Sequence, residues 1–352
     1  MKTSLKVTSA AVAAVLLSGG VALTAAPAPA TASEAALSST AHWAVVKSVR
    51  NSADFGFSAV AATGSHSAWA FEETTADPVA WLLDGSVSKR FALPPLGDGY
   101  SIVAASASSP DNVWAAGGNR ALRWNGASWR LMRSFSSRVV SVTAVSRTDV
   151  LVLTASSGTW RFDGSSWAKM PGARGLSQAS AVSGRDIWAI AGTDVAHWNG
   201  RKWTRTSIRS LLPANSEFSF YTLADIYARS AANVWVAASG NTQDEGGPLV
   251  LLHYYSGHWH KVTLHGLYLG PDALVSDGRG GLWIPVGYPG DRTGRMLHFT
   301  GGAIHTVAMP VGKRTFFADA SVAPGTKVIY VAGATLPAGL GPIRAVVLRY
   351  GS

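Results

Sequence analysis

The chain has 352 residues, a formal net charge of +10 at pH 7, 37 glycines, 14 tryptophans and no cysteine. Hydrophobic residues make up 47% of it and charged residues 14%, a composition that excludes an intrinsically disordered chain. The lack of cysteine excludes disulfides, thiolate metal sites and a cysteine nucleophile. A chain of this length is long enough for one large domain or two ordinary ones.

Residues 1–32 have the pattern of a secretory signal peptide. Lys2 and Lys6 precede an apolar stretch at 10–17, and small residues with two A-x-A sequences follow it. The apolar stretch is too short for a stable membrane span, and no cysteine follows it that could carry a lipid anchor. We therefore expect a secreted, extracellular protein with no membrane anchor after cleavage, and a short linker at 33–41. An uncleaved N-terminal anchor is the alternative.

A three-part phrase recurs seven times between residues 42 and 352. Its first part is a short buried-strand pattern, its second a strand that runs into a turn such as Asn-Gly or Asp-Gly, and its third a tryptophan past that turn. Asn-Gly and Asp-Gly supply the positive φ that two-residue hairpins need. The central residues of the first part lie 37 to 48 residues apart; they are Trp69, Trp114, Leu151, Trp188, Trp235, Trp283 and Tyr330.

Each copy of the phrase predicts four short strands. Four-stranded units with a period near 45 residues indicate a β-propeller. The seventh copy ends at Tyr350-Gly351-Ser352 without its last strand, and residues 42–46 near the N-terminus supply the missing pattern. We predict an all-β, monomeric, seven-bladed propeller over residues 42–352, closed by an N-terminal strand that completes the last blade.

The phrase resembles the kelch motif over residues 113–118 and 123–129, and it is similar to tectonin-type lectin propellers and to secreted bacterial repeat proteins. The resemblance covers residues 42–352, but the double glycine of kelch is clear in only one blade. The resemblance implies a galactose-oxidase-type propeller fold. The cofactor of the copper-radical oxidases needs a cysteine cross-linked to a tyrosine, so we expect no cofactor here.

Two further positions recur in the repeat. The residue before the second strand is polar and is interpreted as a turn residue; examples are Asn112, Asp149, Asp186 and Asn233. A basic residue stands beside the third-strand aromatic and is interpreted as part of a packed or solvated strand face; this set is Arg123, Arg161, His197, His298 and Arg349.

The histidines of the fifth repeat do not predict a metal site. His258 and His260 share one strand face, and His253 aligns with Trp81 and Trp160. A catalytic zinc needs three converging protein ligands, and the sequence offers no third one.

The basic charge concentrates in blades two to four. It favours an anionic partner such as a cell-wall polymer, with a merely soluble basic surface as the alternative. No nucleic-acid motif accompanies it. The residues are Arg130, Arg133, Arg138, Arg201, Lys202, Arg205 and Arg209.

The loops after the second strands are long in blades five, six, seven and one, which are contiguous in a closed ring. Binding residues concentrate on loops held by a rigid scaffold. We therefore predict a ligand-binding face there, with variable solvent loops as the alternative, and its candidates are Glu72, Glu73, Asp77, Asp244, Glu245, Tyr288, Asp291 and Arg292. Three acids in innermost strands could hold a cation or meet channel water; they are Asp225, Asp272 and Asp319.

These features predict a non-catalytic binding module for a carbohydrate, an anionic cell-wall polymer or an extracellular protein. No catalytic residue is assigned, because no G-x-S-x-G, H-E-x-x-H or P-loop sequence is present. One alternative is a glycoside hydrolase or lyase that uses the acidic loops as paired carboxylates. A second is an extracellular protein-interaction scaffold.

Overall fold

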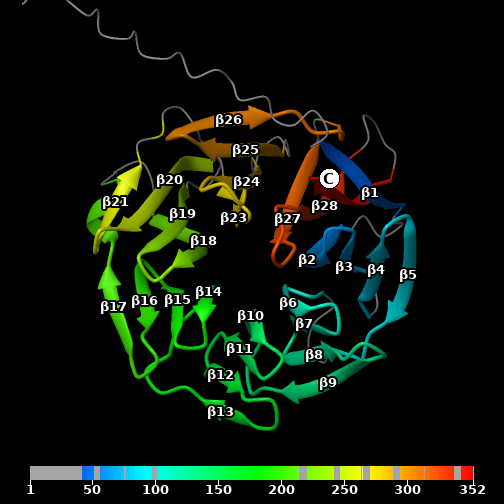
Figure 1. Ribbon diagram of the computed structural model, residues 1–352, viewed down its shortest axis with the longest axis horizontal. Coiled ribbons are helices and arrows are strands. Elements are labelled where there is room, and N and C mark those ends of the chain that lie inside the picture. The colour runs from blue at the N-terminus through cyan, green and yellow to red at the C-terminus, as the bar shows by residue number, and fades with distance from the viewer. Residues whose placement is uncertain are drawn as a thin grey trace, which may run out of the picture. The chain divides into compact units, whose positions relative to one another are not determined.

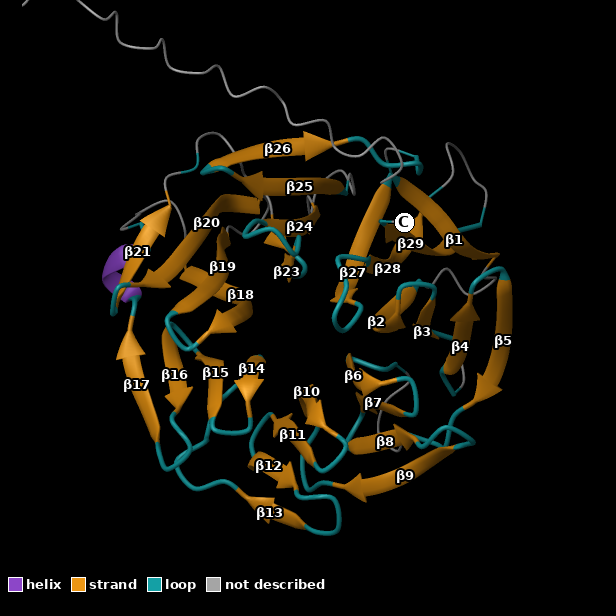
Figure 2. Cartoon of the chain, in the orientation of Figure 1, coloured by secondary structure: helices purple, strands orange, loops and turns teal. Residues whose placement is uncertain are grey.

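The computed structural model describes residues 42–50, 56–74, 77–96, 101–213, 220–241, 246–262, 264, 270–287, 294–312, 314–336 and 342–351. These residues form a ring of seven antiparallel β-sheets, the blades of a propeller (Figure 1). In each blade the first strand lies nearest the ring axis and the last lies outermost. The helix content of the described residues is one 3-10 turn, η1 (Arg209–Leu211), between blades 4 and 5 (Figure 2).

The first four blades follow the chain in order. Blade 1 consists of β2 (Phe57–Gly64), β3 (Ser67–Glu72), β4 (Val79–Asp84) and β5 (Val87–Ala92). Blade 2 consists of β6 (Ala104–Ser109), β7 (Asn112–Gly117), β8 (Arg120–Trp124) and β9 (Trp129–Ser134). Blade 3 consists of β10 (Val139–Ser146), β11 (Asp149–Thr154), β12 (Gly158–Phe162) and β13 (Trp167–Lys169). Blade 4 consists of β14 (Ala179–Ser183), β15 (Asp186–Ala191), β16 (Asp194–Trp198) and β17 (Trp203–Ser207).

Among the last three blades, blade 6 has a split innermost strand and blade 7 takes its outermost strand from the N-terminal side of the chain. Blade 5 consists of β18 (Phe220–Ser230), β19 (Asn233–Asn241), β20 (Gly246–Tyr255) and β21 (His258–Val262). The innermost strand of blade 6 is split into β22 (Gly270–Pro271) and β23 (Val275–Ser276), which both pair with β24 (Leu282–Gly287); β25 (Arg295–Thr300) and β26 (Ala303–Val307) follow. Blade 7 consists of β27 (Thr315–Val322), β28 (Ile329–Thr335), β29 (Arg344–Tyr350) and β1 (Trp43–Arg50).

The ring closes between the two ends of the described chain. Strand β1 pairs antiparallel with β29, with Trp43 opposite Tyr350 and Arg50 opposite Arg344. In Figure 1, β1 is blue and lies beside the red C-terminal strands. The predicted all-β, seven-bladed propeller, completed by an N-terminal strand, is therefore confirmed.

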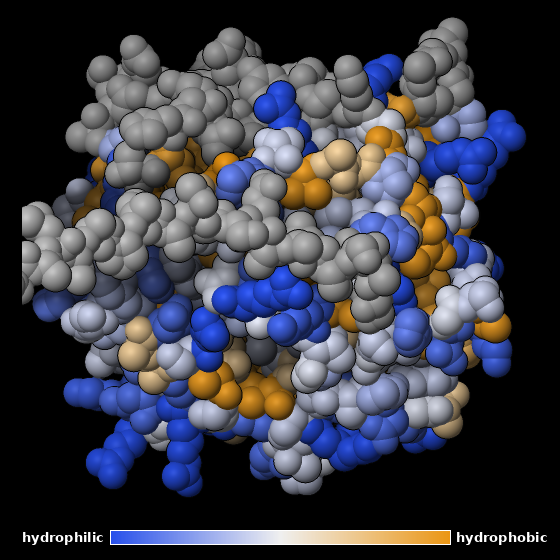
Figure 3. All heavy atoms as spheres, turned by 45° about the horizontal axis from the view of Figure 1, so that its top comes forward, coloured by the Kyte–Doolittle hydropathy of each residue, from blue (hydrophilic) through white to orange (hydrophobic). Residues whose placement is uncertain are grey.

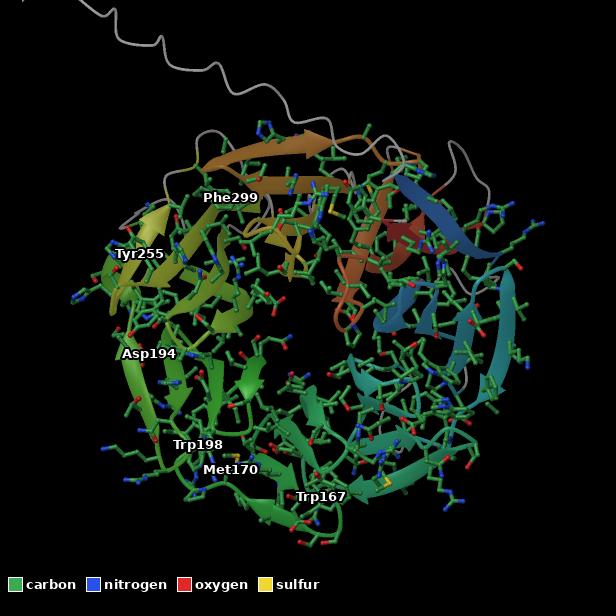
Figure 4. All side chains as sticks on the ribbon, viewed as in Figure 1. Trp167, Met170, Asp194, Trp198, Tyr255 and Phe299 are labelled. Atoms are coloured by element: carbon green, nitrogen blue, oxygen red, sulfur yellow. The ribbon has the colours of Figure 1, made fainter. Side chains whose placement is uncertain are left out.

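The hydrophobic core lies between the blades. The described buried residues form seven clusters, each shared by two neighbouring blades. Alternation along each strand sends one set of side chains to the preceding blade and the other set to the following blade. Met170 and Trp198, labelled in Figure 4, lie together in this way between blades 3 and 4.

Aromatic trios join most neighbouring blades. The central residue of one blade packs on the third-strand aromatic and the fourth-strand tryptophan of the next blade. Trp69, for example, has its ring centroid 4.8 Å from that of Trp124 and 5.0 Å from that of Trp129. Edge-on and tilted contacts at this range are the favoured geometries for aromatic rings. The tryptophan of the repeat therefore holds blades together.

The prediction of two-residue turns after the third strand is wrong for blades 2, 3 and 4. Trp124 pairs with Trp129 across a loop of four residues, 125–128. The Asn125 Oδ1 atom accepts hydrogen bonds from two backbone N–H groups of the loop at 3.0 Å each, and Gly126 has a φ of 97°. The asparagine therefore closes a longer loop through its side chain.

The alignment predicted for blade 5 is also wrong, by one residue. Trp235 pairs with His253 across β19 and β20, just as Trp188 pairs with His197 in blade 4. His253 is therefore the basic partner of its blade, and Tyr254 is the third-strand aromatic that packs on Trp188. His253 therefore does not occupy the position that Trp81 and Trp160 have in their blades.

In blades 3, 4 and 5 the two recurring polar positions bind each other. Asp149 accepts two hydrogen bonds of 2.7 Å from Arg161, and Asp186 lies 2.8 Å from His197 Nε2. In blade 5, Asn233 lies 3.1 Å from His253. In blade 6 the recurring position is Gly281, and His298 instead lies 3.0 Å from Asp277, four residues earlier. The histidines also stack on the central tryptophans Trp188, Trp235 and Trp283, at centroid distances of 4.0, 3.7 and 4.1 Å.

Candidate binding groove between blades 4 and 5

Three of the acids predicted for the binding face lie on the described part of blade 1. Glu72 ends β3, is 7% exposed, and accepts a 2.7 Å hydrogen bond from Trp81 Nε1. Glu73 follows it, half-buried, with its backbone N–H bonded to the Gly56 carbonyl at 3.1 Å. Asp77 is exposed, and its carbonyl accepts a 2.8 Å hydrogen bond from the Thr74 hydroxyl.

The other five predicted residues lie outside the described residues: Asp244, Glu245, Tyr288, Asp291 and Arg292. The strands of the β19–β20 hairpin are longer than predicted, because β19 continues to Asn241 and β20 begins at Gly246. Much of the loop expected over 239–247 is therefore paired strand.

The three innermost acids meet in the central channel. The innermost segments of blades 2 to 7 bound a cavity of about 350 Å³, and Asp225, Asp272 and Asp319 line it. Asp225 accepts 2.8 Å hydrogen bonds from Ile226 N and from Leu274 N of the next blade. Asp319 likewise accepts hydrogen bonds from Ala320 N at 2.8 Å and from Val60 N of blade 1 at 2.9 Å. These two carboxylates therefore join neighbouring blades.

Desolvation in the channel raises the pKa values of all three carboxyl groups above the ordinary value for aspartate. Burial raises the pKa of Asp225 to about 6, against the hydrogen bonds that lower it. Desolvation by the channel walls raises the pKa of Asp272 to about 7, although the residue as a whole is exposed. Burial together with the charge of Asp225 raises the pKa of Asp319 to about 7. Within the described residues, no three acidic or histidine side chains converge in a way that could hold a metal ion.

Among the described helical residues there is no segment of the length and apolarity that crossing a membrane requires. The described surface seen in Figure 3 is mostly hydrophilic, and its hydrophobic residues form separate patches. Small, scattered patches of this kind are usual on folded proteins.

A groove of about 380 Å³ lies between blades 4 and 5. Its aromatic wall is the trio Trp188, Tyr254 and Trp259, with Tyr254 and Trp259 at centroid distances of 5.0 and 6.1 Å from Trp188. Residues with hydroxyl side chains also line the groove; they are Thr204, Thr206, Ser207 and Ser210. A volume of this size is within the usual range for small-molecule sites.

The segment after β17 forms one edge of the groove. Ile208 and Leu212 are buried, at 1% and 7% exposure, in the cluster between blades 4 and 5. They anchor the η1 turn, so that Ser210 and Leu211 lie at the groove. Other aromatic trios of the ring lack such a turn beside them within the described residues.

Trp188, one residue of the aromatic wall, is held in place by the Asp186–His197 pair. His197 stacks on Trp188 with an angle of 14° between the ring planes, and Asp186 binds its Nε2 atom at 2.8 Å. Trp188 is 5% exposed, and its indole Nε1 is buried with no hydrogen-bond partner in the described structure. Trp188 is therefore held in place by contacts within its own blade, and a preorganised side chain reduces the entropy cost of binding.

The sequence did not predict this groove. Trp188 and Trp259 are interpreted from the repeat as packing residues, which they are, and Thr204 and Thr206 carry no motif. The one signal was the length of the segment between blades 4 and 5, from residue 207 to 219. The space beside the trio arises from the position of η1, which depends on the assembled ring.

No protein-family model and no curated protein matches this chain. Many chains of solved structures do match. One, described as YCF48 bound to D1 peptide, is 13% identical over 88% of this chain and 97% of its own, with a TM-score of 0.60. YCF48 from Cyanidioschyzon merolae is 15% identical over 88% and 98%, with a TM-score of 0.59. The WD40 propeller domain of Doa1 is 11% identical over 88% and 97%, with a TM-score of 0.60. At these identities the likeness shows the fold alone.

Proposed function

We propose that this protein is a secreted carbohydrate-binding module of the kelch-like or tectonin-like kind, with the groove between blades 4 and 5 as its binding site. The observation that carries the proposal is the composition of the groove. A pyranose ring presents C–H groups on its faces and hydroxyl groups around its edge. An aromatic wall flanked by four hydroxyl side chains matches both parts.

The propeller suits a binding role because the scaffold holds the groove rigid. The wall is built from strands of two blades, and strands position side chains more accurately than loops. The signal-peptide pattern at 1–32 supports a role outside the cell, where polysaccharides are abundant.

The experiment is a retention assay on a panel of neutral and acidic polysaccharides, with mass spectrometry of both the retained protein and any released fragments. Trp259→Ala should weaken retention by about 5- to 150-fold, because one aromatic contact contributes on the order of 1–3 kcal/mol. Trp167→Ala is the matched control, since Trp167 has the same place in blade 3, is also half-buried and belongs to another trio.

A double variant that leaves the aromatic rings intact distinguishes a loss of binding from a loss of blade packing. Thr204→Val with Thr206→Val removes two groove hydroxyls with little change in shape, and retention should fall. Thr300→Val with Thr306→Val, at two exposed threonines of blade 6, should leave it unchanged. Equal effects of the two pairs would contradict the groove.

The two competing functions give different results in the same assay. Release of fragments would indicate a polysaccharide-active enzyme. A protein-interaction scaffold, which the solved propeller bound to a peptide makes worth testing, would retain no polysaccharide and would capture a protein from culture supernatant.

A further inference from the structure

A basic hollow lies at the turn end of blade 4. Arg185, from the turn before β15, and the loop residues Asn199, Gly200 and Arg201, between β16 and β17, line a hollow of about 660 Å³. Gly200 has a φ of 87°, and a Cβ atom there would lie 3.1 Å from the Cβ of Arg185. The glycine thus lets the loop lie directly against the arginine side chain.

The loop that carries Arg201 is fixed by its own hydrogen bonds. Asn199 Oδ1 accepts the backbone N–H groups of Arg201 and Lys202 at 3.1 Å each. The side chains of Arg185, Arg201 and Lys202 are exposed. The hollow therefore combines an ordered backbone with cationic side chains that are open to solvent.

The positive charge of the hollow is not neutralised by the protein. Within the described residues, neither Arg185 nor Arg201 forms an ion pair. The nearby acids are already engaged, because Asp186 binds His197 and Asp149 binds Arg161 through both carboxylate oxygens. Guanidinium groups in this state bind carboxylate, phosphate or sulfate groups through paired hydrogen bonds.

The hollow and the groove share the β16–β17 hairpin, which contributes residues to both. Arg201 is three residues before Thr204, so their Cα atoms are at most about 11 Å apart. On the other side, Asp186 follows Arg185 directly and binds His197, which lines the groove. A chain molecule that occupies the groove can therefore extend to the hollow over a distance of one or two sugar units.

We infer that the natural ligand is an acidic glycan, with one sugar in the groove and the acidic group of a neighbouring unit against Arg185 and Arg201. This inference rests on the proposed function. The shared chemistry is an anionic oxygen group on a polysaccharide, which a carboxylate or a sulfate could supply.

Matched pairs of probes test it. Binding of oligogalacturonate is compared with that of its neutral methyl ester, and binding of dextran sulfate with that of dextran, by titration calorimetry at two salt concentrations. We expect the unmodified protein to bind at least one acidic probe at least about tenfold more tightly than its neutral partner. The acidic probe that does so identifies the anionic group.

The variant Arg185→Gln/Arg201→Gln should remove that difference and leave binding of the neutral probe unchanged. The control is Lys89→Gln/Arg90→Gln, which removes the same two charges from exposed positions on β5 of blade 1. The control should keep the preference for the acidic probe. An equal loss in both variants would show a diffuse charge effect and overturn the assigned hollow.

The failures of the two proposals are distinguishable. If the unmodified protein binds acidic and neutral probes equally, or binds none of the four but binds a neutral polysaccharide of the wider panel, the acidic-glycan inference is wrong and the proposed function stands. If it binds none of the four probes and nothing in the wider polysaccharide panel, the proposed function itself fails.

Discussion

Trp43 packs edge-on against Trp283, with ring centroids 5.4 Å apart and ring planes at 89°. Trp43 belongs to β1 and Trp283 to β24, so a residue near the beginning of the described chain joins blade 7 to blade 6. Tyr350 completes the trio at 5.2 Å from Trp43 and 4.8 Å from Trp283. The same kind of aromatic contact that joins most neighbouring blades thus also fixes the N-terminal strand in the ring.

Trp43→Ala should destabilise the protein by about 3–5 kcal/mol, the usual cost of truncating a buried large aromatic residue. Trp43 is 6% exposed, and its loss would leave a cavity beside Trp283 and Tyr350. Urea unfolding followed by fluorescence measures the change, and Trp43→Phe should recover part of it. An unchanged midpoint in Trp43→Ala would show that the aromatic contact does not stabilise the closed ring.

The ring and its closure could be predicted because the information is local and repeated. Each copy of the phrase carries its own strand and turn pattern, and the displaced Trp43 strand matches the one missing piece. The pairing of Asp186 with His197 was not predicted, because the two positions meet only when the second and third strands are in register. In blade 5, consecutive tyrosines before the turn concealed which of them faces the core.

The candidate site was less predictable than the fold for a related reason. Trp188, Tyr254 and Trp259 are ordinary members of the repeat, and nothing in their sequence distinguishes them from the other trios. The groove depends on how Ile208 and Leu212 anchor the η1 turn in the core between blades. Such a placement follows from packing across two blades and has no periodic signal.

The channel acids should make the protein more stable as the pH falls from 8 to 5. A raised pKa in the folded state means that the folded protein binds more protons between about pH 4 and 7, so its free energy of unfolding falls as the pH rises through that range. For Asp225, a rise from 3.8 to about 6 corresponds to roughly 3 kcal/mol. The described residues that line this cavity include no lysine, arginine or histidine to offset the charge.

Asp272→Asn is the cleanest test of this pH dependence. The Asp272 side chain makes no hydrogen bond to the described residues, so the variant removes a charge and no contact. At pH 8 it should have a higher urea midpoint than the unmodified protein, and the difference should vanish near pH 4. Asp84→Asn, at an exposed position of blade 1, is the control. A difference that is constant with pH would exclude titration of Asp272 as its cause.

Glu72 should contribute more to stability than its neighbour in the predicted acidic cluster. Its carboxylate accepts the Trp81 indole N–H at 2.7 Å, and Lys47 Nζ lies 3.7 Å from the centroid of the Trp81 ring. Glu72→Ala would leave the indole without this acceptor and cost about 1–3 kcal/mol. Asp77→Ala, at an exposed side chain, should cost less than about 0.5 kcal/mol. Thermal unfolding compares them, and equal midpoints would argue against a structural role for Glu72.

His253 should respond strongly to the residue that faces it. Burial, and then the neighbouring His260, lowers the pKa of His253 to about 4, and Asn233 Oδ1 lies 3.1 Å from its Nε2 atom. Asn233→Asp places a carboxylate there, as Asp186 does for His197, and should raise the pKa of His253 by about 1–3. NMR titration of the imidazole signals measures the change directly.

The same substitution should alter how stability depends on pH. In the unmodified protein, His253 lowers the free energy of unfolding as the pH falls from about 6.5 to 4, because only the unfolded chain binds its proton there. If Asn233→Asp raises the pKa of His253 in the folded protein above 6.5, the contribution of His253 to the free energy of unfolding instead increases as the pH falls through the new pKa. If the His253 signals titrate unchanged in Asn233→Asp, the facing side chain does not control the charge of this stacked histidine.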